Sequence, residues 1–288
     1  MTARSYAILE TRGVVRLAGT EAHAFLQGLV SNDVAGVGPH RAVYAAMLTP
    51  QGKYLHDFLV LALGDGLALD CERARIDDLI RRLTMYRLRA RIEIADMSDK
   101  YLVAALMDAA KPDLDAGDGA LFPDPRLGAL GWRAVLAREG AAARLEAAGY
   151  TPAGAEAYDS LRLALGVPDG SRDMLVDRSF LLESNFEELN GVDFDKGCYV
   201  GQENTARQKH RGNVRKRLMP VAIDGPAPAP GTPILLGGRD AGTMRSSADG
   251  KGIALLRLEA VEEAAETQEP LVAGEARLTP VKPGWGRA

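Results

Sequence analysis

The chain has 288 residues and a formal net charge of -4. Because ordinary domains hold roughly 100 to 150 residues, we expect two or three subdomains. A hydrophobic content of 47% and a charged content of 26% exclude a disordered or fibrous chain. The acidic balance also excludes a global attraction to nucleic acid or to an anionic membrane, so any such contact depends on a local patch.

The targeting and redox features predict a cytoplasmic protein that does not span a membrane. The apolar run at residues 58–63 is far shorter than the roughly 18 residues that a membrane-spanning helix needs. The first thirteen residues fit neither a secretory signal nor a transit peptide. Two cysteines cannot build a disulfide framework, which favours a reducing compartment. Cys71 ends an apolar strand pattern, and we expect it to be structural.

The first half of the chain alternates strand and helix patterns in an order typical of an α+β protein. Strand-like runs are predicted at residues 6–17, 43–48, 54–63 and 67–70. Helical spacing of apolar residues is predicted at residues 22–30 and 73–86. The charged face of the second helix is expected to be solvated. Residues 89–95 alternate apolar and charged side chains, which predicts a half-exposed strand with residues 101–106 as its buried neighbour. Since crossover helices do not separate the strands, a doubly wound sheet is disfavoured.

The second half predicts a change of architecture near residue 214. Asp, Gly and Pro are frequent over residues 108–131, which indicates a surface connection or a subdomain boundary. A strand and two helices follow, over 132–136, 141–148 and 155–165. Residues 171–190 have few periodic cues and are interpreted as a candidate wall of a site. From residue 214 onward, short strands broken by turns predict a β-barrel of roughly 70 residues with an acidic helical or loop insert at 259–269.

The stretch Asp195–Glu203 concentrates the reactive side chains of the chain. It places a thiol, an ammonium, two glycines and a carboxylate within nine residues. A cysteine at a glycine-permitted turn, beside a lysine and before a helix start, has surroundings that lower a thiol pKa. Cys198 is therefore a candidate reactive or metal-binding thiol, with Lys196 keeping it ionised. The alternative is that the glycines serve only a turn and that Cys198 is a small buried hydrophobe.

The composition does not predict a Cys-His nucleophile or a resident metal centre. The four histidines include His210, twelve residues beyond Cys198, and its spacing does not place it against the sulfur. A stable iron-sulfur or zinc site needs about four ligands, and this stretch supplies one cysteine. Any metal chemistry is therefore expected to be transient, or shared with a partner or a bound cofactor.

Two further features are candidates for ligand contact. Glu183 lies among Leu181, Leu182 and Phe186, where its two acceptor oxygens can meet paired N-H donors of a flat heterocycle. The alternative is a solvent-facing or helix-capping glutamate. Six cations without an acid between Asn204 and Met219 can hold phosphates, although most such runs are solvated faces.

Residues 196–203, with Arg207 after them, resemble the signature of the YgfZ family of folate-binding proteins. These are relatives of the glycine cleavage system T-protein, and their mitochondrial branch assists assembly of iron-sulfur proteins. Residues 29–34, 49–57 and 182–185 resemble further segments of that family, and the last 70 or so residues resemble its C-terminal barrel.

The resemblance implies an α+β, T-protein-like fold around a central folate pocket. Residues 1–213 would form two interleaved subdomains, the inner one at about 45–140, and residues 214–288 the antiparallel barrel. The implied cofactor is tetrahydrofolate or a derivative, gripped at its pterin by Glu183. The implied functional pair is Cys198 and Lys196, and the implied folate contacts are Glu183, Asn185, Asp57, Tyr199, Gln202, Glu203 and Arg207.

The implied function is support of iron-sulfur enzymes, including those that thiolate tRNA, with client enzymes or cluster-assembly proteins as partners and without direct nucleic-acid contact. T-proteins carry two adjacent aspartates after the hairpin glycine, where this chain has His56-Asp57. That departure disfavours aminomethyl transfer. A one-carbon transferase is therefore kept only as an alternative function. A second alternative is a non-catalytic module that holds tRNA or another polyanion through the basic run.

Overall fold

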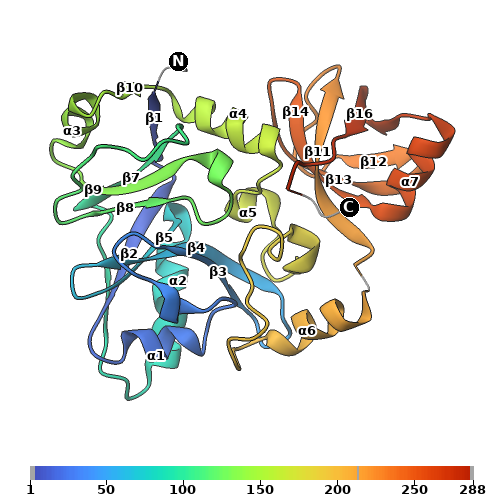
Figure 1. The fold of residues 1–288 in the computed structure, drawn as a ribbon. Coiled ribbons are helices and arrows are strands. Elements are labelled where there is room, and N and C mark those ends of the chain that lie inside the picture. The colour runs from blue at the N-terminus through green and yellow to red at the C-terminus, as the bar shows by residue number, and fades with distance from the viewer. Residues whose placement is uncertain (1–3, 213, 286–288) are drawn as a thin grey trace. The chain divides into compact units, whose positions relative to one another are not determined.

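The computed structural model describes residues 4–212 and 214–285, which fold into two compact units. Most helices and strands are labelled in Figure 1. Unit 1 contains Met1–Pro50, Leu55–Tyr158 and Leu189–Gln202, and unit 2 contains Gln51–Tyr54, Asp159–Glu188 and Glu203–Ala288. The predicted division between residues 213 and 214 stays a prediction.

The first sheet of unit 1 has the strand order β3-β4-β5-β2-β6. Its strands are β2 (Arg12–Ala18), β3 (Val43–Leu48), β4 (Tyr54–Leu63), β5 (Gly66–Glu72) and β6 (Glu93–Asp96). Helices α1 (Ala22–Gln27) and α2 (Ile76–Arg87) pack on it through a core that includes Leu26, Leu79 and Leu83. Strands β3 and β4 are buried at nearly every residue, which explains why both are largely apolar, with His56 and Asp57 of β4 as buried polar exceptions. The expected strands 43–48, 54–63 and 67–70 are confirmed and lie side by side, since β3 and β4 are neighbours and Leu63 faces Gly66 across the turn between β4 and β5.

The second sheet of unit 1 has the order β10-β1-β7-β9-β8. Its strands are β1 (Ser5–Ile8), β7 (Tyr101–Leu106), β8 (Ala120–Pro123), β9 (Trp132–Ala137) and β10 (Thr151–Pro152). Helix α3 (Ala141–Ala147) covers it, and α4 (Ala155–Leu165) leads out of the unit. Short 3-10 helices lie at η1 (Val34–Gly36), η2 (Arg73–Arg75) and η3 (Gly128–Leu130).

Two strand predictions in this region are wrong. β7 pairs with β1 and β9, whereas β6 pairs with β2 in the other sheet, so residues 101–106 are not the neighbour of residues 89–95. The strand also starts only at Glu93, because tight turns after helix α2 occupy residues 88–92. The expected surface connection 108–131 contains strand β8, which pairs with β9.

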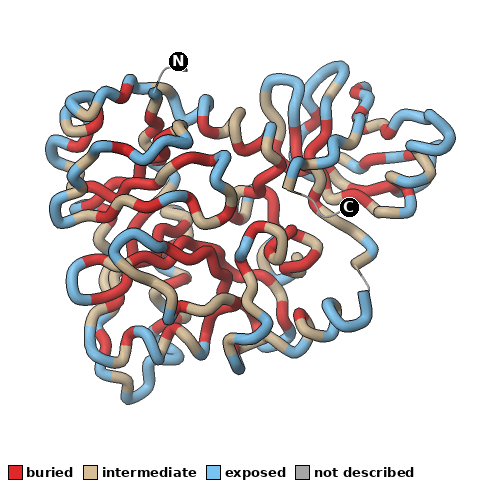
Figure 2. The backbone as a smooth tube through the Cα atoms, viewed as in Figure 1, coloured by how far each residue is buried: buried red, intermediate tan, exposed pale blue. Residues whose placement is uncertain are grey.

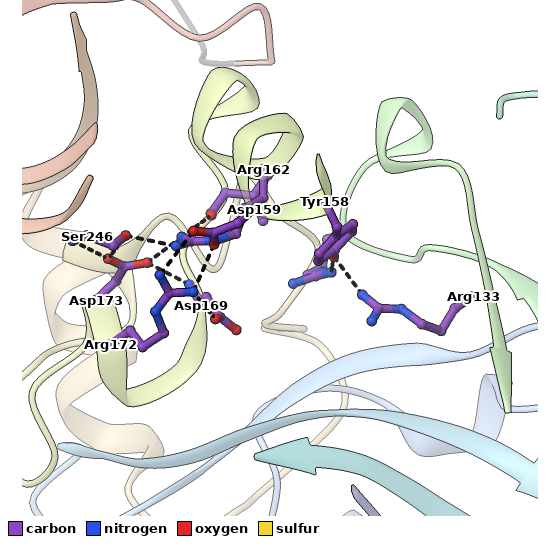
Figure 3. A network of polar contacts seen from close by, with 10 residues as sticks. Arg133, Tyr158, Asp159, Arg162, Asp169, Arg172, Asp173 and Ser246 are labelled. Atoms are coloured by element: carbon purple, nitrogen blue, oxygen red, sulfur yellow. Dashed lines mark hydrogen bonds and ion pairs between the residues drawn. The ribbon is translucent and has the colours of Figure 1, made fainter. Parts of the chain in front are cut away.

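A buried polar network joins strand β9 to helix α4 in unit 1 (Figure 3). The Tyr158 hydroxyl accepts hydrogen bonds from Arg126 and Arg133, each at 2.7 Å. Asp124 accepts from both guanidinium groups, and this pairing holds the pKa of its carboxyl well below the usual range. Arg133 also lies 3.8 Å from the Asp70 carboxylate on β5, so charged side chains link the two sheets.

Unit 2 is organised around a closed barrel with the order β11-β14-β13-β12-β15-β16. Its strands are β11 (Lys216–Asp224), β12 (Pro233–Leu236), β13 (Arg239–Ala248), β14 (Lys251–Arg257), β15 (Leu271–Ala273) and β16 (Ala276–Pro280). All pairs described between these strands are antiparallel. The acidic insert forms helix α7 (Leu258–Thr267), which packs Ala260, Val261 and Ala264 on the barrel core. The α+β class and the C-terminal barrel are therefore confirmed.

A buried ion pair connects the barrel to the segment that precedes it (Figure 3). Arg162 on α4 donates to Asp173 at the end of α5 (Gly170–Asp173) at 2.7 Å and to the hydroxyl of Ser246 at 2.9 Å. Ser246 donates to Asp173 through both its backbone N-H and its hydroxyl. The pairing of β13 with β14 shifts between Met244 and Ser247. This bulge turns Ser246 toward Asp173, since bulges re-aim side chains.

Burial follows the strands of both units (Figure 2). Cys71 on β5 is only 2% exposed, and burial raises the pKa of its thiol. The expectation that Cys71 is structural is confirmed. Among the described helices, none combines the length and apolar character needed to cross a membrane.

Candidate functional site

Cys198 is exposed, in a loop of unit 1 that leads into helix α6 (Gln202–Arg211). Gly197 and Gly201 flank it with φ angles of 92° and 85°, a left-handed backbone that glycine adopts without strain. The Gln202 side chain accepts a hydrogen bond from the Tyr199 backbone N-H at 3.0 Å and fixes the entry to the helix. The alternative of a buried, inert Cys198 is therefore wrong.

Lys196 fastens the cysteine loop to the end of helix α1. Its ammonium donates to the backbone carbonyls of Gln27 and Val30, each at 2.6 Å. The Gln27 side chain donates in return to the carbonyl of Lys196 at 3.4 Å, and the Val200 N-H donates to Gly28. A basic side chain at a helix C-terminus satisfies carbonyls that lack a partner within the helix.

The residues just before the loop are fastened to the turn that follows α1. The Asn32 side chain donates to the carbonyl of Asn190 at 2.6 Å, and the Ser31 hydroxyl donates to Gly191 at 2.6 Å. The N-H of Asp193 donates to the carbonyl of Ser31 at 3.0 Å. Two segments that lie far apart in the sequence, residues 27–34 and 190–200, thus form one structural element.

The pKa of Lys196 is lowered to about 8, chiefly by burial, while Asp33 and Asp193 act in the opposite direction. The ammonium also lies 5.1 Å from the centre of the Tyr199 ring. Within the described parts of the chain, no hydrogen bond to the Cys198 sulfur is formed. The contacts of Lys196 explain how the loop is held, and its role in ionising the thiol stays a prediction.

Asp57 and His56 lie on β4 and are both buried. Asp57 accepts a hydrogen bond from the Tyr44 hydroxyl at 3.1 Å. The His56 ring lies 2.9 Å from Asp78 on helix α2, and burial lowers its pKa to about 4, so the ring is neutral at pH 7. His56 therefore places a neutral ring, bonded to helix α2, beside the Asp57 carboxylate on β4.

Glu183 lies in unit 2, in the short 3-10 helix η4 (Leu182–Ser184). Its carboxylate is half-buried, and among the described residues it accepts no hydrogen bond and forms no ion pair. Burial raises its pKa, while Lys216 and Lys53 act in the opposite direction. A half-buried carboxylate that accepts no hydrogen bond from the described residues can accept hydrogen bonds from a ligand.

Lys53, at the tip of the β3-β4 hairpin, belongs to the surroundings of Glu183. Its ammonium lies 3.3 Å from the centre of the Phe180 ring and donates to the carbonyl of Arg178 at 3.2 Å. The hairpin tip, Gln51–Tyr54, is part of unit 2, as Glu183 is. Sequence reasoning missed Lys53 and Lys216 as site residues, although both are cations in segments that it had singled out.

The remaining predicted folate contacts differ in their surroundings. Asn185 is buried, and its amide donates to the carbonyl of Leu218 at 2.8 Å and accepts from Arg217 at 3.2 Å. Glu203 and Arg207 are exposed on helix α6, and neither is bonded to another described side chain. Asn185 thus ties η4 to the barrel, whereas the two helix residues are available to a ligand.

A cavity of about 800 Å³ lies within unit 2, beside Asn185. Leu218, Met219, Val261 and Trp285 supply much of its apolar lining. Its volume is in the range of small-molecule pockets. Glu183 is not among its described lining residues, so this cavity and the Glu183 carboxylate are separate features.

The basic run is partly neutralised within unit 2. Lys209 forms an ion pair with Glu187, and Arg217 forms one with Glu188. In the described ranges, no group of three or more His, Cys, Asp or Glu side chains is arranged to hold a metal ion. A metal cluster bound through Cys198 would therefore take its other ligands from elsewhere.

Comparison with known proteins supports two parts of this architecture separately. The GCVT N-terminal domain family matches residues 9–109, and the CAF17 C-terminal beta-barrel domain family matches residues 215–288. The crystal structure of glycine cleavage system aminomethyltransferase T from Bartonella henselae superposes with a TM-score of 0.75 at 14% identity, covering 97% of this chain and 85% of that one. This likeness confirms the T-protein-like fold.

Full-length relatives show the family. The mitochondrial iron-sulfur cluster assembly factor IBA57 of Mus musculus is 32% identical over 311 residues, which cover 96% of this chain and 84% of the relative. The Homo sapiens protein of the same name is 34% identical over 283 residues, covering 88% and 78%. The chain belongs to the IBA57 family. These relatives are iron-sulfur cluster assembly factors, which agrees with the expected role of this IBA57-family protein, and the narrower YgfZ resemblance stays an interpretation.

The expected cytoplasmic location is contradicted, because these IBA57 relatives are mitochondrial proteins. The prediction relied on the low cysteine count, which indicates a reducing environment without saying which compartment provides it. It also relied on the first thirteen residues, whose composition carries no information about the compartment of the folded protein.

Proposed function

We propose that this IBA57-family protein binds tetrahydrofolate or a derivative and supports cluster assembly through one presented thiol, that of Cys198. The observation that carries the proposal is the exposed Cys198 on a loop held by Lys196. A loop fastened at both ends of its turn presents the sulfur to a partner in a defined position. The clients proposed are iron-sulfur enzymes, including those that thiolate tRNA.

The cluster is cargo in this proposal, and Cys198 supplies one of its ligands. The thiol loses its proton to solvent, and the thiolate donates an electron pair to a cluster iron. The iron-sulfur bond to a donor cysteine breaks, and that leaving thiolate takes up a proton. Because a cluster needs about four protein ligands, the partner retains the others, and the shared cluster is transient.

The residues around Glu183 fit a folate. A pterin presents paired N-H donors, and a half-buried carboxylate without an internal hydrogen bond supplies two acceptors. Bound tetrahydrofolate would supply a reduced ring able to carry one-carbon units. The further contacts proposed for the cofactor are Asn185, Asp57, Tyr199, Gln202, Glu203 and Arg207.

The thiol role is tested by Cys198→Ser and Cys198→Ala, with Cys71→Ala as the matched control. The assay is anaerobic activation of a [4Fe-4S] tRNA-thiolating enzyme in the presence of a cluster donor. We expect both Cys198 variants to lose activation while their tetrahydrofolate affinity is unchanged, and the control to remain active. Full activation by Cys198→Ser would remove the thiol from the mechanism.

The folate role is tested by calorimetric titration with tetrahydrofolate. Glu183→Gln keeps the size of the side chain but replaces one acceptor by a donor, and a charged hydrogen bond contributes about 1.5 to 3 kcal/mol. We therefore expect affinity to fall by roughly tenfold or more. Glu266→Ala, an exposed glutamate on helix α7, is the control. Equal affinity of Glu183→Gln and the native protein would show that the pterin assignment is wrong.

A further inference from the structure

The end of helix α2 exposes apolar side chains that the core does not use. Residues 84–89, Thr-Met-Tyr-Arg-Leu-Arg, are all exposed, and we call them the exit patch. Leu88 is 87% exposed, Met85 66% and Tyr86 37%. The buried face of the helix consists of Ile76, Leu79 and Leu83 and ends before the patch. The prediction of a solvated charged face is therefore incomplete, because large apolar groups lie in water here.

The exit patch lies in the middle of a strongly basic stretch. From Leu79 to Ile92 the chain has five arginines and no acidic residue. Arg81 and Arg82 share the carboxylate of Asp78, and Arg91 pairs with Glu21. The side chains of Arg87 and Arg89 form no hydrogen bond or ion pair with another described residue. Their two charges are therefore uncompensated and lie on either side of Leu88.

Leu88 also has an unfavourable backbone conformation. Its φ of 44° and ψ of -104° lie where L-residues are rarely found and where glycine is tolerated. A strained conformation that persists at an exposed leucine costs stability, and no core contact of this nearly fully exposed side chain compensates for it. Glycine would relieve the strain, so the presence of leucine indicates a use for the side chain itself.

The composition of the patch fits a protein partner better than a phosphate-bearing one. Arginine, methionine and tyrosine are enriched in protein interfaces, and lysine is depleted. All five cations from Leu79 to Ile92 are arginines. Phosphate binding gives no use to exposed Leu88 and Met85. An amphipathic membrane helix would need its apolar face free, and that face of α2 is buried in the core of unit 1.

We infer that the exit patch docks an acidic protein surface with an apolar centre. Leu88 and Met85 would enter that centre, and Arg87 and Arg89 would pair with the surrounding carboxylates. In a cluster assembly factor, the partner whose surface would match these apolar and arginine side chains is an acidic protein that carries or receives the cluster. Only this identification of the partner rests on the proposed function. The patch gives the partner a binding surface that is independent of the cluster-binding sulfur.

The test uses the full chain and an acidic [2Fe-2S] carrier protein as the probe, with affinity measured by biolayer interferometry at low and moderate salt. The variants are Arg87→Glu/Arg89→Glu and Leu88→Gly, and Arg277→Glu, an exposed arginine on β16, is the control. We expect the charge reversal to lower affinity about tenfold or more and to reduce its salt dependence, since paired charges steer association. Leu88→Gly should raise the melting temperature and lower affinity.

The same experiment separates docking from the thiol chemistry. Cys198→Ser should bind the apo carrier with native affinity even if it fails to transfer a cluster, and the patch variants should bind weakly with Cys198 intact. Three results would overturn the inference. These are no binding of the carrier to the native chain, native affinity in both patch variants, and patch-dependent binding to vesicles of phosphatidylserine and phosphatidylcholine in place of the carrier.

Discussion

The ammonium of Lys196 lies 2.6 Å from the carbonyl oxygen of Val30, a residue 166 positions earlier in the chain. Together with the bond to Gln27, this contact joins the cysteine loop to helix α1. The presented sulfur thus owes its position to a residue two places before it. The position of Cys198 depends on the integrity of that contact.

Replacing Lys196 by methionine should loosen the loop. The variant removes two hydrogen bonds from a charged donor to half-buried carbonyls, so the free energy of unfolding should fall by about 1 to 3 kcal/mol. Urea unfolding measures this loss, and amide hydrogen exchange at Val200 should become faster. Lys111→Met, at an exposed site, is the control and should change neither quantity.

Stability should depend on pH through His56. Its folded pKa is about 4, below the ordinary 6.5, so the unfolded chain takes up a proton at a higher pH than the folded chain does. The free energy of unfolding should therefore fall as pH decreases from 6.5 toward 4, by about 2 kcal/mol at pH 5. Denaturant titrations of the native chain and of His56→Gln at pH 7 and pH 5 isolate this contribution. Titrating groups away from His56 affect both proteins equally and cancel when the two pH dependences are subtracted. Parallel pH profiles would refute it.

The buried pair of Arg162 and Asp173 should be among the most sensitive sites in unit 2. Both residues are 1% exposed, and removing one partner leaves an uncompensated buried charge. Arg162→Ala is expected to cost about 3 to 5 kcal/mol of unfolding free energy. Arg172→Ala, which removes a half-exposed cation paired with Asp159, should cost about 1 kcal/mol or less. Similar losses in the two variants would contradict this ranking.

Folate binding should weaken in mild acid. Burial raises the pKa of Glu183 above the ordinary 4.5, so its carboxylate gains a proton at a higher pH than an exposed one. If the ionised form accepts the pterin N-H groups, affinity should be constant near neutral pH and fall as pH decreases toward the raised pKa. Calorimetry across this range should show the fall in the native chain and a flatter profile in Glu183→Gln.

Local patterns predicted most elements but not their partners. The hairpin of β4 and β5 follows from two apolar runs and a Gly-Asp-Gly turn, which are neighbours in sequence. The assignment of β7 failed because its partners, β1 and β9, are separated from it by intervening elements, and alternation along a strand does not identify its neighbour. Strand β8 was missed because its four residues lie among turn-forming residues.

The candidate site shows the same limit. The exposure of Cys198 followed from its glycines, which act locally. The contacts of Lys196 could not be read from its neighbours in sequence, because the acceptors are backbone carbonyls on a distant helix end. Carbonyls carry no sequence signal of their own. The surroundings of Glu183 include Lys53 from the hairpin, which only the fold brings to it.

The bulge at Ser246 limits how far the barrel can be treated as a separate module. The family match to the barrel begins at residue 215, yet Asp173 and Arg162, which bond to Ser246, lie before that point. A fragment cut at residue 215 would expose this polar bulge to solvent and lose its buried ion pair. Transplanting the barrel between relatives would therefore require the two helices that carry Arg162 and Asp173 to be transferred with it.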